Sequence, residues 1–186
     1  MINARTADDD MRIDEDLYEL AVALGRAAVS RRVRIATAES CTGGLVAAAV
    51  TAVAGSSDWF DGGFVSYSNE AKVDALAVPA RTLERFGAVS EEAARAMAQG
   101  ALRGGRAQWA VAVTGIAGPA GGTPDKPVGT VCFAWAGPGG IDALRTRLEG
   151  DRAGVRRESV RIALQGLLDR LAYAAGPLAS NDRSMP

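Results

Sequence analysis

The segment WAVAV at residues 109–113 is wholly apolar, which is typical of a strand buried on both faces of a sheet. Elsewhere strand patterns alternate with helix patterns, and this alternation predicts an α/β sheet covered by helices on both faces. Strands are predicted at 33–38 (VRIATA) and 59–67 (WFDGGFVSY), where Gly62-Gly63 marks a bulge or a close approach. Helices are predicted at about 14–32, 42–53, 69–76 and 90–102.

The second half of the chain adds a hairpin and a long helix. Residues 128–135 (VGTVCFAW) and 141–148 (IDALRTRL) flank a glycine-rich turn, which predicts an antiparallel pair. The sheet is therefore expected to be mixed and mostly parallel, with one antiparallel hairpin. Asp151 is expected to cap a helix that reaches about Ala174. We expect one domain over 14–176, with flexible tails at 1–13 and 177–186.

The composition excludes several kinds of site. The chain has no histidine, which excludes a Ser-His-Asp triad, a Cys-His dyad and any imidazole base, so a hydrolase of this sequence needs Lys, Tyr or a carboxylate as its base. The two cysteines cannot form a disulfide framework. A net charge of -1 argues against binding to nucleic acid. No signal peptide and no apolar run of roughly 18 residues is present, so no membrane contact and a cytoplasmic location are expected.

The segment Ala38–Gly44 (AESCTGG) is the first candidate site. Ser40 is predicted to lie between a strand and a helix, where free backbone N–H groups favour a nucleophile with an oxyanion site. The alternative is that Ser40 only caps the helix. Cys41 is a rival nucleophile, because a helix N-terminus lowers the pKa of a thiol, but it ranks below Ser40 without a histidine partner. Glu39 is a further candidate acid or base.

The second candidate site follows the next strand, at Tyr67-Ser68-Asn69-Glu70-Ala71-Lys72. Lys72, if partly desolvated, can act as a general base for a serine. The alternative is an exposed lysine paired with Glu70 or Asp74. Tyr67 either donates its hydroxyl or only packs.

Two later segments complete the candidates. The loop 114–127 (TGIAGPAGGTPDKP) leaves the buried strand and is long for a connection, which favours ligand binding over a freely variable solvent loop. Arg152 opens the last helix. It either reaches an anion at the edge of the sheet or lies on a solvated face with Arg156 and Arg157.

Taken together, the blocks AESCTGG, SYSNEAK, GAVSEEAARAMA and AVTGIAGPAGGTPDKPVGTV, followed by GDR before a long helix, resemble the CinA C-terminal domain family over roughly residues 15–174. The resemblance implies a three-layer α/β/α sandwich. It also implies an amidohydrolase that converts nicotinamide mononucleotide and water into nicotinate mononucleotide and ammonia, without a metal or an organic cofactor. We expect the stand-alone form of the family and a homo-oligomer, a dimer or larger.

The resemblance also implies the site residues. Ser40 is similar to the nucleophile of the family and Lys72 to its base. The other active-site and substrate-binding positions that it implies are Tyr67, Thr114, Thr42, Gly43, Gly44, Asn69, Gly115 and Arg152. Two alternatives stay open: a pyridine-nucleotide-binding module without turnover, and an enzyme acting on another small amide. The presence of both Ser40 and Lys72 favours an enzyme.

Overall fold

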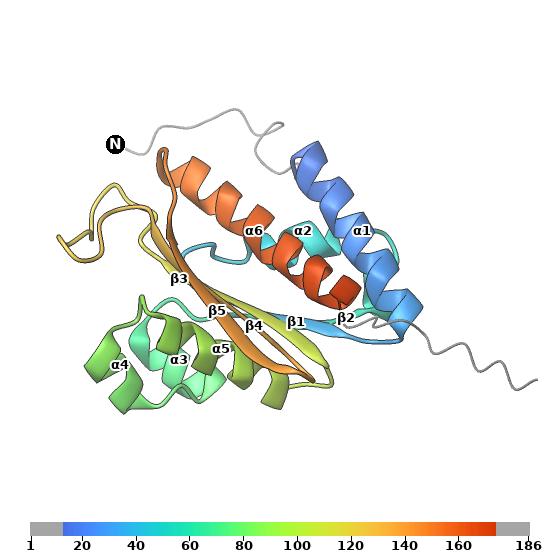
Figure 1. Cartoon of the computed structure of the whole chain (residues 1–186), viewed down its shortest axis with the longest axis horizontal. Helices are drawn as coiled ribbons and strands as arrows, with labels where there is room; N and C mark the ends of the chain where they lie inside the picture. Colours follow the sequence, from blue (N-terminus) through green and yellow to red (C-terminus); the bar gives the residue numbers. More distant parts are fainter. Residues whose placement is uncertain (1–12, 174–186) are drawn as a thin grey trace, which may run out of the picture.

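A five-stranded sheet runs through the centre of the computed structural model, which describes residues 13–173 (Figure 1). Its strand order is β2–β1–β3–β4–β5. The strands are β1 (Ile35–Glu39), β2 (Phe60–Val65), β3 (Trp109–Gly115), β4 (Thr130–Gly137) and β5 (Gly140–Arg147). β1 is parallel to β2 and β3, whereas β4 is antiparallel to β3 and β5, so only β4 runs against the other four. The predicted mixed sheet with one hairpin is confirmed.

Helices cover both faces of the sheet, which confirms the expected three layers. One face carries α1 (Glu15–Arg31), α2 (Leu45–Thr51) and α6 (Arg152–Tyr173), and the other carries α3 (Asn69–Leu76), α4 (Ala80–Phe86) and α5 (Glu91–Arg103) (Figure 1). A short 3-10 turn, η1 (Ser56–Asp58), precedes β2. No helix within residues 13–173 has both the length and the apolar character needed to cross a membrane.

Two local predictions need correction. α2 begins at Leu45 rather than near Thr42, because Gly43 and Gly44 adopt the positive φ angles 61° and 96° and interrupt any helix there. α4 was not predicted, since its seven residues bury only Leu83 and show no apolar period. The predicted flexible tails lie outside the described residues, apart from Ile13.

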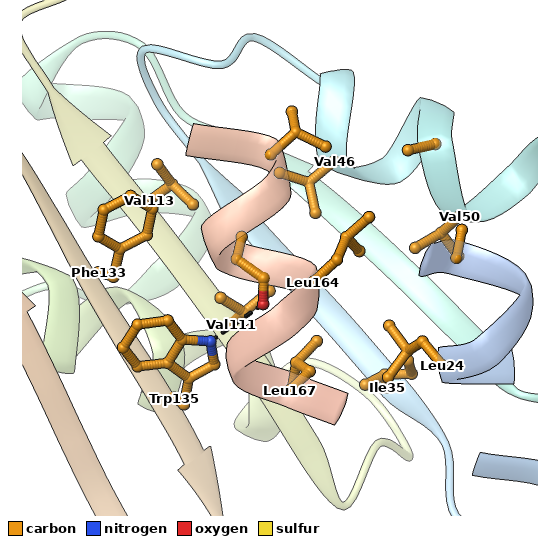
Figure 2. Packing of buried hydrophobic residues seen from close by; sticks show 14 of the residues in the cluster. Leu24, Ile35, Val46, Val50, Val111, Val113, Phe133, Trp135, Leu164 and Leu167 are labelled. Carbon is orange, nitrogen blue, oxygen red and sulfur yellow. Dashed lines mark hydrogen bonds between the residues drawn. The ribbon is translucent and has the colours of Figure 1, made fainter. Parts of the chain in front are cut away.

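Strand alternation divides the core into two unlike halves. Large side chains of β1, β3 and β4 face α1, α2 and α6 and pack with leucines and valines of those helices (Figure 2). The opposite face of the same strands is built from alanines, and α5 brings further alanines and Met97 against it. Small side chains on both surfaces allow a helix to lie close to a sheet. The strand ends are therefore held between two rigid layers.

β2, at the edge of the sheet, lies unusually close to β1. A Cβ on Gly63 would lie 2.7 Å from Thr37 Oγ1, so only glycine fits there without a shift, and the β1–β2 register slips between Ile35 and Ala36. This confirms the bulge or close approach predicted at Gly62-Gly63. As a result, the end of β2 lies directly beside the end of β1, and Ser66 N donates to Glu39 O at 2.8 Å.

Candidate active site

The carboxyl ends of three parallel strands meet at one edge of the sheet, where ligands of α/β proteins commonly bind. Ser40 directly follows the central strand of the three, β1, and its amide donates to Val113 O of β3 at 2.9 Å. The segment 66–68 follows β2, and α3 then carries Lys72 back toward β1. Segments that are far apart in sequence are thereby brought together.

Ser40 and Lys72 are in direct contact. Lys72 Nζ lies 3.0 Å from Ser40 Oγ, although 32 residues separate them. Three backbone carbonyls of the β2–α3 connection also accept from this nitrogen: Ser66 O at 2.9 Å, Tyr67 O at 3.2 Å and Ser68 O at 3.4 Å. A neutral amine can donate two hydrogens to such carbonyls and keep its lone pair for the proton of the serine. The contact therefore has the geometry of a nucleophile and its base.

Lys72 is only 1% exposed, and burial lowers the pKa of its ammonium from the ordinary 10.5. No carboxylate among residues 13–173 lies within ion-pair distance of it. The alternative of an exposed lysine paired with Glu70 or Asp74 is therefore wrong. Without a carboxylate partner, the charged form of Lys72 is stabilised only by the neutral carbonyl and hydroxyl oxygens around it.

Glu39 is a buried carboxylate beneath the nucleophile. The alternation of β1 turns it toward α2, where its two oxygens accept from Gly44 N at 3.0 Å, Val46 N at 3.0 Å and Ala47 N at 2.8 Å. Thr37 Oγ1 also donates to it at 3.4 Å. A carboxyl group at a helix N-terminus accepts from amides that otherwise lack acceptors. Glu39 therefore anchors the start of α2 instead of facing a substrate.

These contacts change the expected oxyanion site. The amide of Gly44 is taken by Glu39, and that of Gly43 donates to Ser40 O at 3.1 Å. Ser40 is also not the cap of α2, since Gly44 occupies that position. Within the described part of the chain, the amides of Cys41 and Thr42 have no hydrogen-bond acceptor. Thr42 is fully buried and Cys41 nearly so, and their N–H groups are the donors that this loop leaves unused.

Cys41 lies next to Ser40 but is 6% exposed. Burial raises the pKa of its thiol to about 11, so very little thiolate exists at neutral pH. The predicted lowering of this thiol pKa by a helix N-terminus is not seen. α2 begins four residues later, and an amide of its first turn donates to Glu39. This weakens Cys41 as a rival nucleophile.

Tyr67 and Arg152 form the outer part of the site. The Tyr67 side chain is 65% exposed, and Arg152 Nη2 donates to its hydroxyl at 3.4 Å. Arg152 Nη1 donates to Gly118 O at 2.8 Å, so this arginine links the end of β2 to the loop after β3. The hydroxyl of Tyr67 is thus directed at Arg152, and Lys72 contacts Ser40 directly. The backbone carbonyl of Tyr67 is the part that touches Lys72.

Thr114 and Gly115, two other predicted site positions, contact neighbouring parts of the framework. Thr114 Oγ1 donates to Ala88 O at 2.8 Å, tying the segment before α5 to the sheet. A Cβ on Gly115 would lie 2.9 Å from Thr130 O, so β4 rather than a ligand requires this glycine. The Thr42 side chain is fully buried, and its hydroxyl has no partner among the described residues. Asn69 opens α3 on the exposed surface.

Arg156 is a site residue that sequence reasoning missed, because it was grouped with Arg157 on a solvated face. Its Nη2 donates to Thr42 O at 2.8 Å, whereas Arg157 pairs with Asp14 and Asp16 at the surface. Positions four apart on a helix share one face, so its spacing from Arg152 was the available signal. The last helix therefore directs two arginines, not one, toward the ends of the strands.

A cavity of about 610 Å³ lies elsewhere, lined in part by Trp109, Trp135, Gly139 and Arg170. It includes none of the predicted site residues, and its aromatic walls belong to the core, so we place the chemistry at Ser40 instead. Within residues 13–173, no three His, Cys, Asp or Glu side chains gather closely enough to hold a metal ion.

Several known proteins are similar to this chain in sequence. Residues 17–171 match the CinA C-terminal domain. The nicotinamide-nucleotide amidohydrolase PncC of Escherichia coli (strain K12) is 50% identical over 83% of this chain and 94% of its own length. This chain also matches longer relatives, spanning only 36% of a CinA-like protein from Anaeromyxobacter sp. (strain K), at 53% identity, and 40% of a relative from Symbiobacterium thermophilum.

Solved structures agree with the sequence matches. The competence/damage inducible protein CihA from Agrobacterium tumefaciens superposes with a TM-score of 0.83 at 45% identity, covering 87% of this chain and 98% of that one. The sequence blocks, the sandwich and the relatives thus agree, and the chain belongs to the CinA C-terminal domain family.

Proposed function

We propose that this protein is an amidohydrolase that converts nicotinamide mononucleotide and water into nicotinate mononucleotide and ammonia. The observation that carries the proposal is the 3.0 Å contact between Lys72 Nζ and Ser40 Oγ in a buried setting. The nicotinamide-nucleotide amidohydrolase PncC, which is 50% identical to this chain over 94% of its own length, supplies the substrate.

The first half of the reaction forms an acyl-enzyme. Lys72 takes the proton of Ser40 Oγ, and the oxygen attacks the carboxamide carbon of the substrate. The amides of Cys41 and Thr42 stabilise the negative oxygen of the tetrahedral intermediate. The Lys72 ammonium then protonates the amide nitrogen, the C–N bond breaks and ammonia leaves.

The second half returns the enzyme to its starting state. Lys72, neutral again, accepts a proton from water as the water attacks the ester carbon. Collapse of this second intermediate breaks the bond to Ser40 Oγ, and Lys72 returns a proton to the serine. Nicotinate mononucleotide leaves, and neither a metal nor an organic cofactor takes part. We assign Arg152 to the 5′-phosphate, because a guanidinium matches phosphate geometry at the rim of the site.

An ammonia-release assay tests the function. Nicotinamide mononucleotide, nicotinamide riboside and nicotinamide are offered to the wild-type protein and to Ser40→Ala. We expect release from the mononucleotide that depends on Ser40. Binding of the mononucleotide without release by the wild type would favour a binding module instead, and faster release from another amide would reassign the substrate.

A further inference from the structure

Arg156 extends from the first turns of α6 toward the loop that carries the nucleophile. The side chain is partly buried, and its Nη2 donates to Thr42 O at 2.8 Å. A Cβ on Gly43 would lie only 3.5 Å from the same nitrogen, so the guanidinium lies against the bare backbone of the loop. Its contacts bridge 114 residues of sequence.

The charge of Arg156 is not neutralised by a local carboxylate. No Asp or Glu in residues 13–173 lies within ion-pair distance of it, and its Nε is buried without a hydrogen-bond partner in that range. Burying polar groups of this kind without partners costs free energy. The next residue, Arg157, shows the ordinary surface arrangement, with ion pairs to Asp14 and Asp16.

Arg156 supplies the shorter of the two hydrogen bonds that the described residues donate to the Thr42 carbonyl, since Leu45 N donates to the same oxygen at 3.4 Å. Glu39 fixes the amides from Gly44 onward, but the amides of Cys41 and Thr42 lie ahead of that anchor. The Thr42 carbonyl that Arg156 holds belongs to the next peptide unit, whose N–H donates to Ser40 O. Fixing this carbonyl therefore holds the Thr42–Gly43 peptide unit, which adjoins Thr42 on its C-terminal side.

We propose that Arg156 is a positioning residue for the reaction of Ser40: it fixes the Thr42 carbonyl so that the amides of Cys41 and Thr42 remain available to the oxyanion. The inference deepens the proposed function and rests on it for its substrate. Loss of one oxyanion donor costs about 10²–10³ in kcat. Arg156→Met, which loosens both donors without deleting either, is expected to lower kcat about 100-fold with KM nearly unchanged.

The test compares Arg156→Met with Arg157→Met, its matched control on the same helix turn. Steady-state ammonia release gives kcat and KM, and thermal unfolding confirms that each variant folds. We expect Arg157→Met to keep the wild-type kcat. A wild-type kcat for Arg156→Met, a change confined to KM, or an equal loss in both variants would overturn the inference.

Arg156→Lys covers the case in which Arg156→Met does not fold. The ammonium keeps the charge but cannot hold Thr42 with a planar guanidinium, so a kcat below that of wild type is expected. A kcat equal to that of wild type would contradict the inference. Added guanidinium should also restore part of the activity of Arg156→Ala, and it should give no such gain in wild type or Arg157→Met. Absence of this rescue would count against positioning by the guanidinium.

A fluorophosphonate probe separates this inference from the proposed function. Ser40 Oγ attacks the phosphorus, fluoride leaves and Lys72 takes the proton, so labelling requires the nucleophile and its oxyanion donors but no nicotinamide nucleotide. We expect slower labelling in Arg156→Met than in Arg157→Met. If wild type labels but releases no ammonia, the substrate is wrong and the Arg156 comparison still holds. Equal labelling rates in the two variants would refute the positioning of Ser40 by Arg156.

Discussion

Lys72 Nζ lies 3.0 Å from Ser40 Oγ, and among the described residues no carboxylate pairs with that lysine. Serine hydrolases with histidine rely on imidazole as the base, and this chain has none. Here the base is a lysine, and burial makes it easier to deprotonate because it lowers the pKa of the Lys72 ammonium.

Ser40→Ala should abolish ammonia release while the protein stays folded. Removing a covalent nucleophile costs on the order of 10⁴ or more in rate. Cys41→Ala is the neighbouring control and should retain most of the activity, since the pKa of this thiol is about 11. Near-normal turnover in Ser40→Ala together with loss in Cys41→Ala would assign the nucleophile to Cys41.

The rate should rise with pH as Lys72 loses its proton. A base acts in its neutral form, and the lowered pKa of Lys72 moves the rise below 10.5. Below that pKa, kcat/KM should increase about tenfold per pH unit and then reach a plateau. The profile is measured by ammonia release in buffers of constant ionic strength. Lys72→Met should lose both the activity and this rise, and a variant that kept them would remove Lys72 from the mechanism.

Arg152→Ala should weaken the use of the mononucleotide selectively. A charged hydrogen bond contributes roughly 1.5–3 kcal/mol, which corresponds to about 10- to 150-fold in binding. The riboside has no phosphate, so any slow reaction with it should barely change. The measurement is kcat/KM for the mononucleotide and for the riboside, with the wild-type protein and with Arg152→Ala. An equal loss on the two substrates would move Arg152 from phosphate recognition to holding Tyr67 and Gly118.

Glu39→Ala should destabilise the protein strongly. It leaves three backbone N–H groups at the start of α2 without their acceptor, one of them buried and two partly buried, and a fully buried group of this kind costs about 1–3 kcal/mol. We expect the free energy of unfolding, measured with urea, to fall by about 3 kcal/mol or more. Glu70→Ala is the exposed control and should change it by less than about 0.5 kcal/mol. A small effect of Glu39→Ala would mean that water replaces the carboxylate.

Gly63→Ala and Gly62→Ala form a matched pair in β2. A Cβ at Gly63 would meet Thr37 Oγ1 at 2.7 Å, whereas a Cβ at Gly62 meets open space. Gly63→Ala should lower the free energy of unfolding by about 1–3 kcal/mol and disturb the end of β2. Gly62→Ala should leave it unchanged or raise it slightly. Similar unfolding curves for the two variants would show that β1 and β2 can separate to admit the methyl group.

The class of fold and the family follow from the linear pattern of residues. The apolar run WAVAV required a strand covered on both faces, and the strand–helix alternation around it required two helical layers. The starts of two helices could also be predicted. Ser90 and Asp151 accept from the amides of Ala93 and Gly154, each three residues further along the chain. These features depend on neighbours a few residues away, which a linear pattern contains.

Which side chains meet at the site depends on how distant segments pack together. The sequence allowed Ser40 to cap a helix and Lys72 to lie on the surface, and the parallel packing of β1 against β2 brought them into contact instead. It also turned Arg156 inward and Arg157 outward, although the two are adjacent. The physical reason is that such contacts join segments 32 to 114 residues apart. Their existence depends on strand order and helix placement, which no local pattern encodes.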